Sequence, residues 1–227
     1  MQDGHHARES NAVLYGGVGR RTAGRVLAVV VAVLLAGFGF VVLGTRPVAT
    51  WEVLEVRDPA RIHLSHGRFR AQGLQAGETM EPTGIVTDRL SELSLRLDDL
   101  LALRMTPNSA LRLPPPPARW IGRHRRLAVQ GGEVAITSWD RALGDRLIVD
   151  AGIFAIRLEG ADLVVRRHPD LTEVHLLCGA VELTTRGGDV HRLEGLVGMR
   201  FAGEAPPVTI PVDARARELV EALPGAE

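Results

Sequence analysis

The side chains best suited to metal or nucleophilic chemistry are a few histidines and a single cysteine. His175 and Cys178 lie three residues apart in an apolar stretch, with His168 and His191 not far away in the sequence. The stretch alternates like a strand, where residues i and i+3 point to opposite faces, so this pair is poorly placed to share a metal. We therefore expect no metal site. A cysteine in an apolar run is usually a small buried hydrophobe, and Cys178 is predicted to be buried and unreactive.

The acidic and hydroxyl side chains suggest no catalytic site. Asp98 and Asp99 are adjacent, and because neighbouring strand residues diverge, a solvated turn is favoured over a pair of hydrolytic acids. No serine lies in a Gly-x-Ser-x-Gly motif. All 27 basic residues are arginine, and the absence of lysine excludes both a P-loop and Schiff-base chemistry. The sequence predicts a protein that is not an enzyme, with no cofactor and no small-molecule substrate.

One basic cluster could act by contact with a partner. Guanidinium groups donate in pairs to anions, and arginine beside tryptophan is typical of interface hot spots. The basic cluster, within residues 119–126, follows Pro114–Pro117, which we expect to form an extended polyproline loop. A solvated loop beside a sheet edge is the alternative interpretation. The candidate contact residues are Arg119, Trp120, Arg123, Arg125 and Arg126.

The amino-acid composition excludes several further kinds of site and partner. The 27 acidic residues balance the 27 basic ones, so no net basic charge indicates a nucleic-acid partner. The single cysteine excludes an intrachain disulfide and a multi-cysteine zinc site. The hydrophobic content of 45% is sufficient for a folded core.

A long apolar run predicts a membrane anchor. Residues 26–45 read VLAVVVAVLLAGFGFVVLGT, and a helix of this length spans about 30 Å, the thickness of the hydrocarbon core. Arg20, Arg21 and Arg25 precede the run, and the positive-inside rule places the N-terminus in the cytoplasm. We expect a single-pass inner-membrane protein with a periplasmic C-terminal domain. A cleaved signal peptide is the alternative, although the run exceeds the usual 7–15 apolar residues.

After Trp51 the hydrophobic pattern has a period of two. Short strands of this kind at a spacing of 8–12 residues indicate an antiparallel β-roll or sandwich, here of about ten to twelve strands. The expected strands are 91–97, 101–105, 110–113, 126–130, 133–137, 146–149, 153–158, 163–167, 172–177, 181–185, 190–193 and 199–202. Turns are expected between them, among others at Gly131-Gly132 and Glu159-Gly160.

The chain end carries a short helical pattern. Asp213 can cap a helix in which Leu219, Val220 and Leu223 share one face, and Pro224-Gly225 would end it. The expected fold is therefore all-β, preceded by a transmembrane helix and followed by a short helix. The expected segments are a cytoplasmic tail (1–25), the transmembrane helix (26–45), a linker with the first strand (46–59), the β domain (60–204) and a C-terminal tail with the helix (205–227).

Residues 60–202 resemble FecR-like domains. Thr87–Asp99 is similar to the family phrase T-G-x-x-S-x-a-x-L-x-L-x-D-G (a, apolar), and Thr106–Leu113, TPNSALRL, to a-x-P-N-S-x-L-R-L. Leu127–Val134 resembles the L-x-L-x-x-G-x-a hairpin, and Thr172–Leu183 the closing V-x-V-x-x-G-x-V-x-V pair. Of the usual Gly-Thr-x-Phe, only Gly160 is kept.

The resemblance implies an envelope regulator that works through a protein partner, either a receptor or a component of a sigma/anti-sigma system. Residues 1–25 are too few for a folded sigma-binding domain. The alternative from another class is a carbohydrate- or peptidoglycan-binding module, although nine aromatic residues offer few stacking platforms. A hydrolase comes third, with no residues to nominate.

Overall fold

A computed structural model describes residues 18–44, 49–65, 73–116, 125–141, 143, 146–203 and 205–223, and the chain divides into two compact units, residues 1–45 and 46–227. The first unit holds helix α1 (Val18–Gly44), whose side chains are described from residue 26 to residue 40. Every large apolar side chain in that stretch is exposed, from 44% at Val31 to 70% at Phe38. Within the described residues, no helix is long and apolar enough to cross a membrane.

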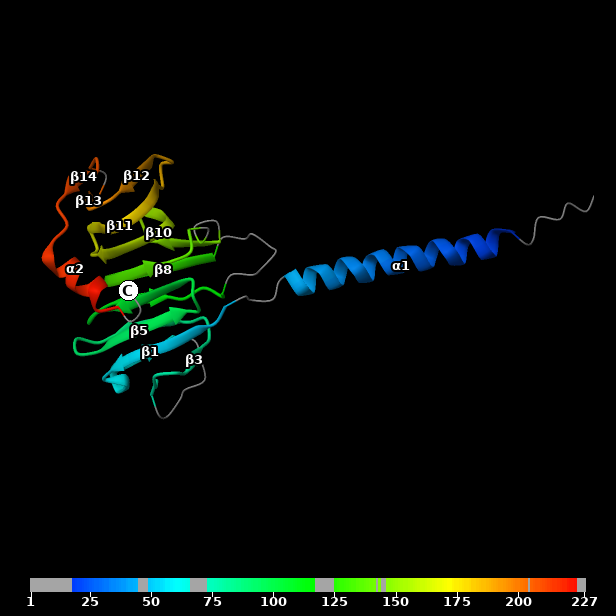
Figure 1. The fold of residues 1–227 in the computed structure, drawn as a ribbon, viewed down its shortest axis with the longest axis horizontal. Coiled ribbons are helices and arrows are strands. Elements are labelled where there is room, and N and C mark those ends of the chain that lie inside the picture. The colour runs from blue at the N-terminus through cyan, green and yellow to red at the C-terminus, as the bar shows by residue number, and fades with distance from the viewer. Residues whose placement is uncertain are drawn as a thin grey trace, which may run out of the picture. The chain divides into compact units, whose positions relative to one another are not determined.

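The second unit is a 14-stranded sheet with a short 3-10 helix, η1 (Pro59–Arg61), and a C-terminal helix, α2 (Ala214–Glu221) (Figure 1). The predicted, mostly β architecture and the C-terminal helix are confirmed. The strands are β1 (Trp51–Arg57), β2 (Ile62–Leu64), β3 (Thr79–Met80), β4 (Gly84–Thr87), β5 (Glu92–Leu97), β6 (Leu101–Met105), β7 (Ala110–Arg112), β8 (Arg125–Ser138), β9 (Leu147–Asp150), β10 (Phe154–Arg167), β11 (Leu171–Thr185), β12 (Val190–Glu194), β13 (Val197–Ala202) and β14 (Val208–Ile210).

Three strands are much longer than predicted. β8, β10 and β11 contain 14, 14 and 15 residues, where the sequence pattern indicated two short strands each. The expected turns at Gly131-Gly132 and Glu159-Gly160 are wrong. At these points, and at Gly179, one glycine takes a positive φ (79° at Gly132, 66° at Gly160, 81° at Gly179), and the strand bends without ending.

Each bent strand contributes to two layers of one folded sheet. The first half of β11 pairs with β13 and its second half with β12, and the two halves of β10 pair with β9 and β8. β8 pairs through its first half with β7 and β9 and through its second half with β6. Because β9 joins β8 to β10 in one layer while β8 and β10 pair directly in the other, the sheet closes on itself.

The bends require glycine because the strands approach closely there. A Cβ on Gly179 would lie 1.9 Å from the carbonyl oxygen of Gly160, and one on Gly132 would lie 2.5 Å from the carbonyl oxygen of Asn108. The inward side chains of both layers then meet in one hydrophobic core, which includes the fully buried Trp51, Leu95, Ile136, Ile156 and Leu183.

Helix α2 covers the outer face of one layer. Ala102 of β6, Ala135 of β8 and Val164 of β10 point away from the main core and pack against Ala216, Leu219, Val220 and Leu223. The small side chains on the strands leave room for the helix, which explains why these strands are apolar on both faces. The predicted apolar face of α2 is confirmed.

Candidate functional site

The predicted contact residues are only partly described. Arg119, Trp120 and Arg123 lie outside the described residues, as does Pro117. Arg125 and Arg126 are the first two residues of β8. Arg125 lies on the inward side at the start of the strand and is half-buried, whereas Arg126 points outward with 70% of its side chain exposed.

These two arginines line a surface groove of about 450 Å³, which we term the arginine groove. Arg112 of β7 joins them, and the apolar part of the wall comes from Leu113, Pro114 and Pro115. The remaining lining residues are Pro82, Thr83 and Gly84, so no described lining residue carries a carboxylate. The geometry offers three guanidinium groups beside an apolar wall.

The walls of the groove are held by backbone contacts. The Leu113 N–H donates to the Thr83 carbonyl at 2.8 Å, and the Arg125 N–H donates to the Arg146 carbonyl at 2.8 Å. Pro114 is buried, and its carbonyl accepts a hydrogen bond from Nε1 of Trp51 at 3.1 Å. A polyproline segment leaves its carbonyls without partners in its own backbone, and the buried indole satisfies this one.

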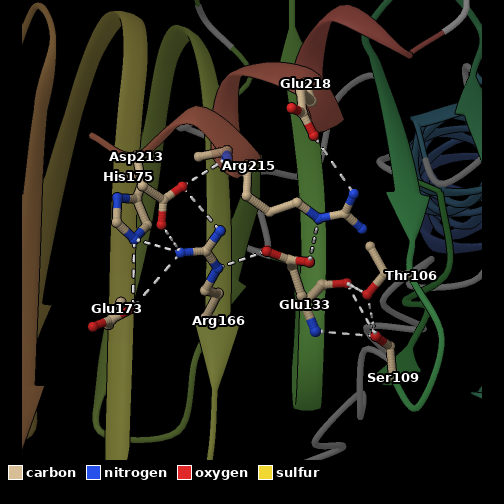
Figure 2. Close-up of polar contacts among 10 residues, drawn as sticks. Thr106, Ser109, Glu133, Arg166, Glu173, His175, Asp213, Arg215 and Glu218 are labelled. Atoms are coloured by element: carbon tan, nitrogen blue, oxygen red, sulfur yellow. Dashed lines mark hydrogen bonds and ion pairs between the residues drawn. The ribbon is translucent and has the colours of Figure 1, made fainter.

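The second polar feature is a row of alternating charges on the outer face beside α2. Arg200, Glu173, Arg166 and Glu133 occupy directly paired positions on β13, β11, β10 and β8. We call these four residues the charge ladder, and Figure 2 shows three of them, Glu133, Arg166 and Glu173. Arg166 Nε donates to Glu133 Oε1 at 2.6 Å, and Arg200 Nε donates to Glu173 Oε1 at 2.7 Å. Cross-strand neighbours of opposite charge stabilise a sheet.

Three members of the charge ladder are largely buried. The side chains of Arg166, Glu133 and Glu173 are exposed by only 14%, 18% and 11%. Ion pairs removed from water in this way are strong once formed, and loss of one partner leaves an expensive buried charge.

The Thr106–Ser109 turn fixes the backbone at Glu133. Asn108 has a φ of 57°, and the turn brings Ser109 against β8. The Glu133 N–H donates to Ser109 Oγ at 3.0 Å, and Ser109 Oγ also lies 3.0 Å from the Glu133 carbonyl oxygen. The Ser109 N–H in turn donates to Thr87 Oγ1 at 2.9 Å. The Pro-Asn-Ser sequence is therefore a structural clamp that positions one end of the charge ladder.

Helix α2 is attached by an arginine at each end. At its start, Asp213 accepts the Ala216 N–H at 2.8 Å as the N-cap, and both oxygens of the same carboxylate bind Arg166. At its other end, Arg104 Nη1 donates to the carbonyl of Ala222 at 2.9 Å, while Arg104 Nη2 donates to Glu92 at 2.5 Å. The Asp213 carboxylate and the Arg104 guanidinium thus bind a backbone N–H and a backbone carbonyl that the helix ends leave without intrahelical partners.

The charge environment shifts the pKa values of this cluster. The hydrogen bond from Arg166 lowers the pKa of Asp213 from 3.8 to about 2. Burial alone would lower the pKa of Arg166, but hydrogen bonds to Asp213 and Glu133 outweigh it and raise that pKa. Burial would raise the pKa of Glu173, and hydrogen bonds from Arg200 and His175 reverse this and lower it. All three groups are thus held in their charged forms.

The residues with potential for chemistry are placed apart. His175 is buried beside Arg166 and Glu173, with its Nε2 at 3.2 Å and 3.5 Å from them, while Cys178 is exposed. The prediction that Cys178 is buried is wrong. Cys178 lies just before the bend at Gly179, where the pairing register of β11 shifts and its side chain turns outward.

The remaining acidic candidates are Asp98 and Asp99. Asp98 and Asp99 are both exposed in the turn between β5 and β6, as predicted. Among the described residues, no group of three or more His, Cys, Asp or Glu side chains is arranged to hold a metal ion. The cluster beneath α2 can hold the helix and the sheet together, and the arginine groove can bind anions.

Sequence reasoning missed two parts of these sites. Arg112 falls in the predicted strand 110–113 but was not among the candidate residues, because its approach to Arg125 and Arg126 depends on the pairing of β7 with β8. The charge ladder was missed because its members lie far apart in the sequence. The sequence shows charged residues at Glu133, Arg166, Glu173 and Arg200, but it does not show that the strands pair so as to bring these positions side by side.

Comparison with known proteins supports the fold. No protein-family model and no curated protein matches the chain. Two crystal structures of a "putative anti-sigma factor" from Parabacteroides distasonis ATCC 8503 are similar to it. One matches with 16% identity and a TM-score of 0.50 over 60% of this chain and 62% of that chain, and the other with 17% identity and a TM-score of 0.49 over 59% and 61%. The chain thus spans less than two thirds of either protein, and the likeness concerns the fold.

Proposed function

We propose that this chain is a FecR-like signalling protein of the cell envelope, anchored in the inner membrane by residues 26–45 and acting through a protein partner of a sigma/anti-sigma system. The observation that carries the proposal is the pairing of a folded β domain with a helix whose described large apolar side chains are all exposed. Such a helix needs an apolar environment, and a bilayer supplies one.

The β domain supports a role in binding rather than catalysis. Its fold is similar, over 60% of the chain, to that of a protein described as a "putative anti-sigma factor". The Pro-Asn-Ser segment on which the FecR resemblance rests forms a clamp between β-strands, in keeping with a fold-determining motif. Its most conspicuous polar network has every carboxylate bound by arginine, which leaves these groups occupied with holding α2 and the sheet.

The predicted topology places the β domain in the periplasm. The arginines that precede the apolar run, Arg20, Arg21 and Arg25, favour a cytoplasmic N-terminus under the positive-inside rule. Within the β domain, the partner contact is proposed to include Arg119, Trp120 and Arg123, which combine an aromatic anchor with bidentate donors.

Membrane fractionation with protease treatment tests the anchor and its orientation. The full chain should resist extraction by alkaline carbonate, and protease added to spheroplasts should digest the β domain. A matched variant, Val30→Asp with Leu34→Asp, places two charges on one face of α1 and should release the protein, because each central charge costs about 2.5–3.5 kcal/mol in a membrane helix. Protection of the β domain in intact spheroplasts would reverse the topology and reject an envelope role.

A further inference from the structure

Among the described residues, carboxylates compensate the positive charge of the arginine groove only at Arg126. No hydrogen bond or ion pair joins the guanidinium of Arg112 or Arg125 to another described residue. Arg126 has one, a contact of 3.5 Å with Asp150 in which the arginine side chain is 70% exposed. Elsewhere on the domain, arginines such as Arg166 and Arg104 are bound by carboxylates. Among the described residues, the groove therefore offers guanidinium groups that an external anion can bind.

The groove lies where the polypeptide enters the β domain. Trp51 is the first residue of β1, and its indole donates to the carbonyl of Pro114 in the groove wall. Only six residues separate Gly44, the last residue of α1, from Trp51. At no more than about 3.6 Å per residue, this connection can extend roughly 25 Å. The length of this connection therefore allows the groove to meet a bilayer that holds α1.

We propose that the arginine groove binds the phosphate headgroups of anionic phospholipids in the bilayer that holds α1. The proposal rests on the membrane anchor of the proposed function and names a second contact with the same bilayer. Guanidinium groups bind phosphate oxygens in bidentate fashion. The exposed Pro115 and the half-buried Pro116 add an apolar surface beside the charges. A groove of about 450 Å³ admits a headgroup together with its glycerol backbone.

The charge of the bilayer should set the strength of this contact. Each basic side chain close to an anionic surface increases association about fivefold, so loss of two arginines should weaken it by about 25-fold. The contact should also be sensitive to salt, because the Debye length falls from about 8 Å at physiological ionic strength to about 3 Å at 1 M. Neutral bilayers of phosphatidylcholine should give no such contact.

Hydrogen–deuterium exchange of the full chain in lipid nanodiscs tests the proposal. Discs of phosphatidylcholine are compared with discs in which half of the lipid is phosphatidylglycerol. Residues 110–113 and 125–128 should exchange more slowly in the anionic discs, and 1 M salt should remove the difference. The variant Arg112→Gln with Arg125→Gln should lose the protection. The matched control Arg186→Gln with Arg217→Gln removes two exposed arginines elsewhere on the domain and should keep it.

Each outcome separates this proposal from the anchor on which it rests. A chain that fails to enter either type of disc rejects the anchor. A chain that enters both, with equal exchange of residues 110–113 and 125–128 in the two lipids, overturns the headgroup assignment and leaves the groove to an acidic protein segment. Protection that persists in the Arg112→Gln, Arg125→Gln variant also overturns it. Inorganic phosphate at millimolar concentration should not reproduce the protection, and if it does, the groove is a free-anion site.

Discussion

Replacement of Arg166 by methionine should destabilise the β domain strongly. The substitution keeps much of the side-chain volume and removes the charge at the centre of the charge ladder. It breaks the 2.6 Å contact with Glu133 and both contacts with Asp213, whereas Glu173 retains Arg200 at 2.7 Å. Glu133 is then left 82% buried with only Arg215 nearby, at 3.7 Å.

The expected loss follows from this burial. Removal of one partner from a buried ion pair typically costs 3–5 kcal/mol, and because Asp213 is 45% exposed and can be hydrated, we expect the lower end, about 3 kcal/mol. For a domain of this size, each kcal/mol shifts Tm by about 2–4 °C, which predicts a decrease of about 6–12 °C.

Thermal unfolding of residues 46–227, followed by circular dichroism, measures the effect. Arg192→Met is the matched control, since Arg192 also contacts two carboxylates, Glu194 and Glu159, but is 53% exposed. This control should leave Tm nearly unchanged. Adding Glu133→Gln to Arg166→Met should restore part of the loss by removing the orphaned charge. Equal Tm values for Arg166→Met and Arg192→Met would refute the claim that the charge ladder stabilises the domain.

Three further predictions concern α2, the bends and Cys178. The pKa of Asp213 is about 2 in the folded state and 3.8 ordinarily, so its contribution to stability is complete above pH 3.8 and is lost as the pH falls toward 2. The full shift would correspond to about 2.4 kcal/mol of stability, which the 45% exposure of the side chain reduces to about 1 kcal/mol. Urea unfolding at a series of pH values measures this loss, and Asp213→Asn should abolish it. Gly179→Ala should prevent folding or lower Tm far more than Gly195→Ala, because both positions have a positive φ but only Gly179 also faces a backbone oxygen at 1.9 Å; similar Tm values would contradict the steric argument. Exposed Cys178 should react with a polar maleimide at a rate close to that of a free thiol, and slow labelling of the native protein would show that it is covered.

The sequence was sufficient for the elements whose patterns are local. Alternation of apolar and polar residues predicted β5 and β6 closely, because each strand has one face in the core. Asp213 predicted the start of α2, since an N-cap needs only its own side chain and a backbone N–H three residues later. These signals lie within one short segment.

What depended on long-range pairing could not be predicted. Gly132 and Gly160 indicate a turn when read alone, and only pairing with neighbouring strands shows that each is a bend inside a continuous strand. The bend at Gly179 likewise turns Cys178 outward from an apolar run. The charge ladder and Arg112 depend on register across several strands, and local sequence carries no information on that register.

In-cell photo-cross-linking is the most direct test of the proposal that the β domain acts through a protein partner. A photoreactive amino acid replaces Ala118 in the full chain, next to the candidate contacts, and cross-linked products are identified from membranes. The account predicts that a sigma-system component is cross-linked, and that Trp120→Ala with Arg123→Glu removes the product while circular dichroism shows an unchanged fold. Membranes that yield no cross-linked protein, or a product that a well-folded double variant retains in full, would contradict it.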